Sequence, residues 1–367
     1  MGLIKDIYSK TFYEKLALSL AKVLPNFDEK KFMVAILPSS FVAMEWKQRM
    51  QHTTTVLHQF MPASYSESVG LLELLIAQLK QDGFTEQRLE FMFLPEYVAK
   101  YGIDDFENSV KALELLTQYI SAEFAVRPFL LKYGSRMLAE MLKFSTHPNY
   151  HVRRFASEGS RPRLPWGAAI PWLKADPKEL LPLLENLKND EHEYVRRSVA
   201  NNLNDITKDH PLIVVELAKR WKGHSVQTDA IIKHACRSLL KAGHPEILNF
   251  YGLTADHLTV SDFIIETPKI KFGEEVEFAF TIENNNDISR YIRLEYTIYY
   301  LKNNGSLAGK VFKISEKTYS AQQKVRIKRK QSFKVITTRK FYPGHHRLSI
   351  MVNGMEMAIG DFELVKE

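Results

Sequence analysis

Two stretches of the sequence, His147-Pro-Asn-Tyr-His-Val-Arg-Arg-Phe-Ala-Ser-Glu158 and His192-Glu-Tyr-Val-Arg-Arg-Ser-Val-Ala-Asn201, repeat one pattern. Each stretch places an Arg pair at the start of an expected helix. Aligning Val152 with Val195 gives a period of 43 residues. A period of this size is typical of solenoids built from stacked two-helix repeats. The pattern therefore predicts a helical solenoid whose paired arginines recur on one side.

The composition is typical of a globular chain without membrane segments. Of its 367 residues, 45% are hydrophobic and 25% are charged, and its apolar runs are shorter than a membrane span. The N-terminal residues contain no signal-peptide core, so we expect a cytoplasmic protein. The single cysteine, Cys236, excludes an intrachain disulfide and a multi-cysteine zinc site. The net charge of +7 permits a polyanionic partner such as nucleic acid.

The sequence divides into two parts with different periodicity. Residues 1–255 carry apolar side chains at helical spacing, which predicts HEAT-like repeats. A third repeat-like unit, residues 229–237, has Lys233 where the earlier units have an Arg. Residues 256–367 instead alternate apolar and polar side chains, as at 275–284, and about seven short strands fit there. We therefore predict an all-α HEAT-like repeat solenoid followed by an immunoglobulin-like β-sandwich, a two-domain α + β architecture.

The paired arginines predict a basic surface along the stacked repeats. Such a surface can follow a phosphate backbone, and its binding would depend strongly on salt concentration. HEAT repeats also carry a structural Arg that pairs with an Asp of a neighbouring repeat, although one such partner cannot satisfy two arginines. The candidate backbone-binding residues are Arg153, Arg154, Arg161, Arg163, Arg196, Arg197, Lys233 and Arg237.

Three acidic residues interrupt these basic rows. Ion pairs on helix surfaces are one explanation, since residues four apart share a helical face. A catalytic role is the other, because a carboxylate beside a phosphate backbone is repelled and its position needs a reason. Hydrolysis of an N-glycosidic bond provides one, since a fixed anion stabilises an oxocarbenium-like sugar or orients water. At helical spacing, the acids and their arginines are Glu123 with Arg127, Glu158 with Arg154, and Asp205 with Arg197.

The loop that follows the first Arg pair ends at Trp166. Pro162 and Pro165 stiffen this loop, which also carries two arginines. A rigid loop with arginines and an aromatic side chain suits contact with a distorted nucleotide. Alternatively, Trp166 begins the next helix and packs in the core. Phe124, next to Glu123, is a second aromatic candidate for the same site.

Three segments resemble the AlkC branch of the HEAT-like DNA alkylation-repair glycosylases. The segments are long and unusual, and they lie within about residues 115–210, whereas the first hundred residues have no comparable signature. Some members of this branch have a C-terminal immunoglobulin-like domain, in agreement with the strand pattern. The segments are Glu123-Phe-Ala-Val-Arg-Pro-Phe-Leu-Leu-Lys-Tyr133, Phe155-Ala-Ser-Glu-Gly-Ser-Arg-Pro-Arg-Leu-Pro-Trp166 and Tyr194-Val-Arg-Arg-Ser-Val-Ala-Asn-Asn-Leu-Asn-Asp205.

The resemblance implies a monofunctional DNA glycosylase that acts on double-stranded DNA without a metal or organic cofactor. It implies 3-methyladenine as the leading substrate and 3-methylcytosine as a further one. Glu123, Glu158 and Asp205 would surround the sugar of the damaged nucleotide, and Trp166 and Phe124 would line the same site. The family has no tight pocket for a flipped base and holds bent DNA with the lesion exposed. We expect a monomer that associates with the nucleoid when it binds DNA.

The second part of the chain has its own basic run, with eight basic and no acidic residues between positions 324 and 340. In a strand, Lys324, Arg326 and Lys328 share one face. This predicts either a further DNA contact or a charged edge strand that resists aggregation. Beyond this strand, the run continues with Lys334, Arg339 and Lys340.

Two other functions stay open from the residues alone. A non-catalytic HEAT scaffold that binds DNA or a protein would have the same arginine rows, but no need for Glu158, Asp205 and Trp166 together. A nuclease or phosphodiesterase would usually need clustered His and Asp metal ligands, whereas the twelve histidines are scattered. The adjacent pair His345-His346 has no third ligand at evident spacing, and we expect it in a solvated turn.

Overall fold

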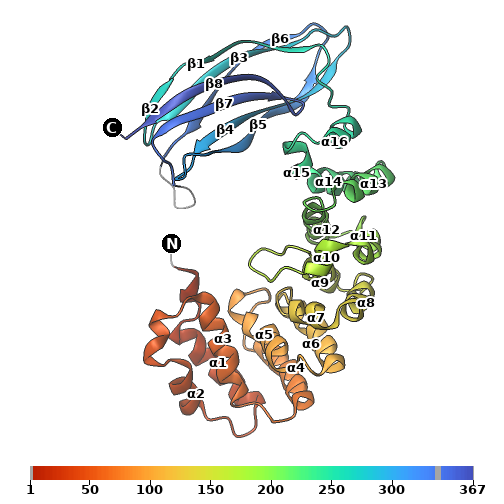
Figure 1. The fold of residues 1–367 in the computed structure, drawn as a ribbon. Helices are drawn as coiled ribbons and strands as arrows, with labels where there is room; N and C mark the ends of the chain where they lie inside the picture. The colour runs from red at the N-terminus through yellow and green to blue at the C-terminus, as the bar shows by residue number, and fades with distance from the viewer. Residues whose placement is uncertain (1–2, 335–339, 367) are drawn as a thin grey trace. The chain divides into compact units, whose positions relative to one another are not determined.

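The computed structural model describes residues 3–334 and 340–366, and its helices precede its strands along the chain (Figure 1). The chain forms two compact units, Met1–Ala235 and Cys236–Glu367. The change from helix to strand lies after this division, between α16 (Pro245–Phe250) and β1 (Leu258–Ile265). Two short helices therefore belong to the second unit. The predicted boundary after residue 255 lies in this segment and not at the division between the units.

The first unit consists of stacked helices (Figure 1). The two helices with the Arg pair, α9 and α12, pack against each other, and α12 packs against α14. Val152 and Val195 are the third residues of α9 and α12, and both are fully buried, so the HEAT-like solenoid is confirmed. The helices are α1 (Lys10–Val23), α2 (Glu29–Ile36), α3 (Trp46–His58), α4 (Tyr65–Gln81), α5 (Phe93–Tyr101), α6 (Phe106–Tyr119), α7 (Val126–Tyr133), α8 (Ser135–Phe144), α9 (Tyr150–Gly159), α10 (Pro171–Ala175), α11 (Leu181–Leu187), α12 (Glu193–Ile206), α13 (Pro211–Trp221) and α14 (Val226–Ala235), with short 3-10 turns η1 (Ile4–Ile7), η2 (Ser39–Ala43), η3 (Leu89–Met92) and η4 (Lys178–Leu180).

Local sequence determines where α9 begins and ends. The Asn149 side chain accepts a hydrogen bond from the backbone nitrogen of His151 at 2.8 Å and so caps the first turn. The helix ends at Gly159, which is buried where no side chain fits. A Cβ added there would lie 2.7 Å from Cγ1 of Val126. After Gly159 the chain leaves the helix and enters the loop that ends at Trp166.

The second unit is a sandwich of two sheets with the strand orders β1-β3-β6 and β2-β8-β7-β4-β5. The alternating apolar residues of β3, such as Phe278 and Phe280, are fully buried and share one core with residues of β4 and β7. The immunoglobulin-like sandwich that the alternation predicts is confirmed. Its remaining elements are α15 (Arg237–Lys241), β2 (Lys269–Lys271), β3 (Glu275–Asn284), β4 (Arg290–Leu301), β5 (Leu307–Tyr319), β6 (Lys324–Ser332), β7 (Gly344–Val352) and β8 (Met355–Val365).

Candidate active site

Two arginines join the three acidic residues that the sequence singled out. Arg154 contacts the carboxylate of Glu123, and its Nη2 lies 3.8 Å from Oε1 of Glu158. Arg161 binds Glu158 through Nη1 at 2.7 Å and Asp205 through Nε at 2.8 Å. These five residues, termed the ionic chain, come from the turn before α7, from α9, from the following loop and from α12. The fold thus brings all three carboxylates together.

The ionic chain is largely shielded from water. The exposed fractions of the Glu123, Glu158 and Asp205 side chains are 16%, 8% and 3%. Burial acts to lower the pKa of Arg154, but the negative charges of Glu123 and Glu158 outweigh it, so the pKa is raised overall. The pKa of Arg161 is also raised, because Asp205 and Glu158 outweigh its burial. Both guanidinium groups are therefore permanent positive charges that hold the carboxylates in place.

Arg127 holds the loop after α9 and does not pair with Glu123, so that predicted pair is wrong. Glu123 lies in a turn before α7, and the two residues therefore do not share a helical face. The Arg127 side chain is buried and donates to the carbonyl oxygens of Gly159 (3.0 Å), Ala168 (2.7 Å) and Arg161. Burial and the charge of Arg161 lower the pKa of Arg127 to about 10, which leaves it positive at neutral pH. Arg127 thus fixes the path of the loop that carries Arg161.

The predicted pairing of Asp205 with Arg197 is also wrong. Arg197 lies 2.8 Å from Glu193, one turn earlier on the exposed face of α12. Asp205 instead points to the buried side of its helix, where it binds Arg161 and where Lys208 lies 2.9 Å away. Spacing along one helix could not indicate a partner that a loop from the preceding repeat supplies.

Trp166 has an exposed and strained conformation in this loop. It is 84% exposed and its φ is +64°. A bulky residue at positive φ costs roughly 1–3 kcal/mol, which the surrounding structure must offset. The alternative that Trp166 starts a core helix is wrong, because the next helix, α10, begins at Pro171. An exposed aromatic ring held on a strained loop is suited to contact with a ligand.

A cleft of about 610 Å³ lies against the ionic chain. Glu123, Glu158 and Trp166 are among its lining residues. Sequence reasoning missed Tyr194, another lining residue, whose ring centroid lies 4.7 Å from the guanidinium carbon of Arg154. Tyr194 directly precedes the second Val-Arg-Arg motif, so its place in the repeat was the available signal.

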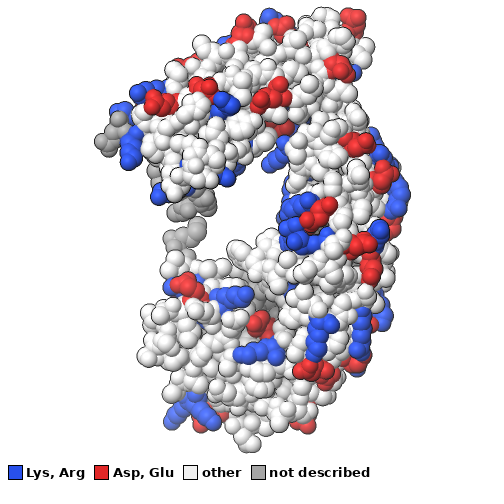
Figure 2. All heavy atoms as spheres, in the orientation of Figure 1, with Lys and Arg blue, Asp and Glu red and all other residues white. Residues whose placement is uncertain are grey.

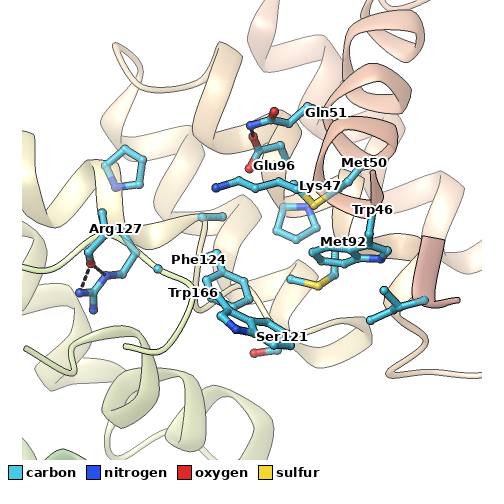
Figure 3. Close-up of a pocket in the computed structure, with 16 residues that line it drawn as sticks. Trp46, Lys47, Met50, Gln51, Met92, Glu96, Ser121, Phe124, Arg127 and Trp166 are labelled. Atoms are coloured by element: carbon cyan, nitrogen blue, oxygen red, sulfur yellow. Dashed lines mark hydrogen bonds between the residues drawn. The ribbon is translucent and has the colours of Figure 1, made fainter. Parts of the chain in front are cut away.

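A second hollow, of about 480 Å³, adjoins this cleft. Figure 3 shows Trp46, Met92, Phe124 and Trp166 turned toward one another around it. Phe124 and Trp166 also line the cleft. Trp46 and Met92 come from the first hundred residues, which carry no signature. Only the tertiary fold places these isolated residues at the site.

Two of the predicted backbone-binding arginines make contacts between repeats. Nε of Arg153 binds Asp190 at 2.6 Å, and Arg196 donates to the carbonyl oxygen of Asp190 at 2.8 Å. This is the structural arginine–aspartate pairing of HEAT repeats. Arg163 is more exposed and pairs with Asp209 at 2.6 Å. Figure 2 shows acidic side chains beside basic ones on the face in view and no continuous basic stripe.

The other predicted basic contacts lie on α14 and in the second unit. Lys233 is on α14 and Arg237 begins α15. On β6, an edge strand of its sheet, Lys324 lies 2.7 Å from Glu283, and Lys328 contacts Glu266. Arg326 donates to the carbonyl oxygen of Asp262 at 2.7 Å. Exposed ion pairs of this kind contribute little to stability and match the edge-strand interpretation. Of the run's last residues, Lys334 and Lys340 are described, whereas Arg339 lies outside the described residues.

The prediction of a solvated turn for His345 and His346 is wrong. Both residues belong to β7, and the His346 side chain is fully buried. Its ring centroid lies 5.6 Å from that of Phe333 and 5.4 Å from that of Phe362. Burial lowers the pKa of His346. The histidine is therefore a core residue of the sandwich.

In residues 3–334 and 340–366, no three or more His, Cys, Asp or Glu side chains are arranged to hold a metal ion. The helices of the described chain are either too short or too polar to cross a membrane. The thiol of Cys236 is free and buried.

Comparison with known proteins finds relatives over the whole chain. The uncharacterized protein YhaZ of Bacillus subtilis (strain 168) is 41% identical over 365 residues, which cover 99% of this chain and 100% of YhaZ. A structure of the Pseudomonas fluorescens alkylpurine DNA glycosylase AlkC, bound to DNA containing an abasic site analog, is 37% identical with a TM-score of 0.92, and the match covers 99% of this chain and 100% of that chain. Residues 259–366 match the C-terminal Ig-like domain of uncharacterised protein YhaZ, and residues 180–210 match the HEAT repeat. The chain therefore belongs to the AlkC-type family of HEAT-like alkylpurine DNA glycosylases.

Proposed function

We propose that this protein is a monofunctional DNA glycosylase that hydrolyses the N-glycosidic bond of cationic alkylated bases in double-stranded DNA. The leading substrate is 3-methyladenine, and 3-methylcytosine is a further one. The observation that carries the proposal is the ionic chain, which joins Glu123, Glu158 and Asp205. Glu123 and Glu158 line a cleft together with two exposed aromatic side chains, Trp166 and Tyr194. The family relationship supports the same reaction.

The reaction needs a negative charge next to the sugar. As the bond between C1′ and the base breaks, the base leaves with both bonding electrons and the sugar becomes oxocarbenium-like. A base that carries a positive charge departs as a neutral molecule, so no residue has to protonate it. Water then forms a bond to C1′ and gives its proton to a carboxylate. Glu123 and Glu158, which line the cleft, can stabilise the sugar cation and orient this water.

Arg154 and Arg161 have a positioning role in this mechanism. Each arginine holds two carboxylates in fixed directions. Their positive charges offset the negative charges of the carboxylates at a site that must also accept DNA. Preorganised charges of this kind need no rearrangement during the reaction, which is why they stabilise a transition state more than water does. The carboxylates can thus face the sugar, while the small net charge of the site avoids strong repulsion of the DNA phosphates.

Selection of damaged bases follows from the same chemistry. N3 alkylation weakens the glycosidic bond before the protein acts, whereas an unmodified adenine has too high a barrier for help from the sugar side alone. A tight pocket that encloses a flipped base is therefore not required. Damaged bases would be distinguished from normal ones by the weakness of their glycosidic bond and by contacts with Trp166 and Phe124.

The experiment is base release from methylated DNA, measured by mass spectrometry under single-turnover conditions. Loss of a preorganised electrostatic contact typically costs about 100-fold or more in rate, so we expect Glu158→Gln to slow release of 3-methyladenine by about that factor. Glu123→Gln and Asp205→Asn test the other two acids. Glu193→Gln is the matched control, because Glu193 is an exposed acid of the same solenoid. Unchanged release in Glu158→Gln removes this residue from the mechanism, and no release by the wild type favours a non-catalytic scaffold.

A further inference from the structure

The hollow beside the cleft has the lining of a binding site for a flat heterocycle. Its walls are mostly apolar and include Trp46, Met50 and Met92 together with Phe124 and Trp166. A volume of about 480 Å³ lies in the range of small-molecule sites, which combine apolar walls with a few polar groups. Aromatic and methionine side chains of this kind favour stacking of flat rings. The hollow thus offers flat apolar surfaces next to the cleft that Glu123 and Glu158 line.

Three of the polar side chains that line this hollow, Lys47, Gln51 and Glu96, lie together, whereas Ser121 and Arg127 lie away from them (Figure 3). Glu96, at its far side, accepts a hydrogen bond of 3.4 Å from Gln51, and Lys47 projects toward the same region (Figure 3). Burial raises the pKa of Glu96, an effect that Gln51, Lys47 and Lys100 oppose. The carboxylate is therefore a partly desolvated acceptor in apolar surroundings, where a hydrogen bond from a ligand is strong.

The hollow and the cleft share part of their lining. Trp46, Met92, Ser121, Phe124 and Trp166 border both. A group that leaves a sugar held beside Glu123 can therefore enter the hollow by passing Phe124 and Trp166, without crossing the ionic chain.

We infer that this hollow receives the alkylated base after its bond to C1′ has broken, with Trp46 and Trp166 as stacking surfaces and Glu96 as acceptor for the exocyclic amino group. This inference rests on the proposed function. Released 3-methyladenine and 3-methylcytosine are both flat and neutral and both carry an amino group, so one site suits both. Because the base enters only after cleavage, the site does not require the lesion to be enclosed beforehand. Holding the base away from C1′ prevents its recombination with the sugar cation.

The test is equilibrium dialysis of free 3-methyladenine against the full chain, which requires no turnover. We expect saturable binding to the wild type, about tenfold weaker binding to Glu96→Gln because a neutral acceptor replaces a charged one, and weaker binding to Trp46→Leu. Glu67→Gln is the matched control, since Glu67 lines a different hollow in the same unit. Circular dichroism and urea unfolding of all three variants should match the wild type, which shows that they are folded.

The outcomes separate this inference from the proposed function. Base release from methylated DNA without saturable binding of the free base overturns the inference and leaves the function intact. Binding that neither Glu96→Gln nor Trp46→Leu weakens also overturns it, because the base then binds elsewhere. If the wild type releases no base from methylated DNA, the proposed function fails, and with it the assignment of the hollow as a product site.

Discussion

Arg161 is the residue whose replacement tests the ionic chain most directly. It is buried and binds Glu158 at 2.7 Å and Asp205 at 2.8 Å. Arg161→Met keeps most of the side-chain volume and removes the charge. The two buried carboxylates then lose their shared partner, although each keeps a second cation: Arg154 lies 3.8 Å from Glu158, and Lys208 lies 2.9 Å from Asp205.

The magnitude follows from this arrangement. Removing one partner of a buried ion pair typically destabilises a protein by roughly 3–5 kcal/mol, because the remaining charge is buried without compensation. The second cations compensate in part, so we expect a loss near the lower limit, about 3 kcal/mol at pH 7.

Urea unfolding followed by circular dichroism at about 222 nm reports mainly on the first unit, which contains most of the helices. Arg163→Met is the matched control, because Arg163 belongs to the same loop but makes an exposed pair with Asp209. We expect this control to lose less than about 1 kcal/mol. Equal losses for Arg161→Met and Arg163→Met would refute the reasoning.

Three further predictions concern backbone strain, packing and a buried histidine. Trp166→Gly relieves a positive φ, so the free energy of unfolding in urea should stay unchanged or rise by up to about 1 kcal/mol. The rate of 3-methyladenine release should fall roughly tenfold or more. A clear loss of stability would contradict the backbone strain at Trp166. Gly159→Ala should cost roughly 1–3 kcal/mol, because its Cβ meets a neighbouring side chain, whereas Gly70→Ala, in open space on α4, should be neutral or stabilising in the same measurement. Burial lowers the pKa of His346, so the unfolded chain binds a proton that the folded chain rejects, and stability should fall as the pH drops below about 6.5. Thermal melts of His346→Phe should lack this part of the acid loss, and an identical pH dependence would contradict the assignment.

The fold was predictable where one local pattern matched one structural period. Val152 and Val195 mark equivalent buried positions of two helices because the repeat places them identically against their neighbours. The strict alternation in β3 likewise predicts a strand with one face in the core. The short helices α15 and α16 do not follow from pattern, because their membership of the second unit depends on packing and not on periodicity.

The site was predictable in its residue types but not in its pairings. The family resemblance and the acids among the arginines pointed to Glu123 and Glu158, but helical spacing assigned Glu123 to Arg127. Spacing assumes that both residues lie on one helix, whereas a turn and a loop supply the actual contacts. The position of Trp46 could not be predicted for a related reason. Trp46 and Trp166 line one hollow although they lie more than a hundred residues apart, and local periodicity does not reveal such a contact.

The two arginines of each pair make different contacts, and this difference decides which of them can bind the DNA backbone. The first arginine of each pair, Arg153 or Arg196, binds the segment between repeats. The second arginines differ, since Arg154 belongs to the buried ionic chain, while Arg197 is 65% exposed and paired only on the surface. A phosphate can replace a weak surface partner such as Glu193 at little cost, but it cannot reach the buried guanidinium of Arg154 without displacing Glu123 and Glu158. The repeat therefore provides a stable solenoid first, and only its exposed second arginine remains suited to the DNA backbone.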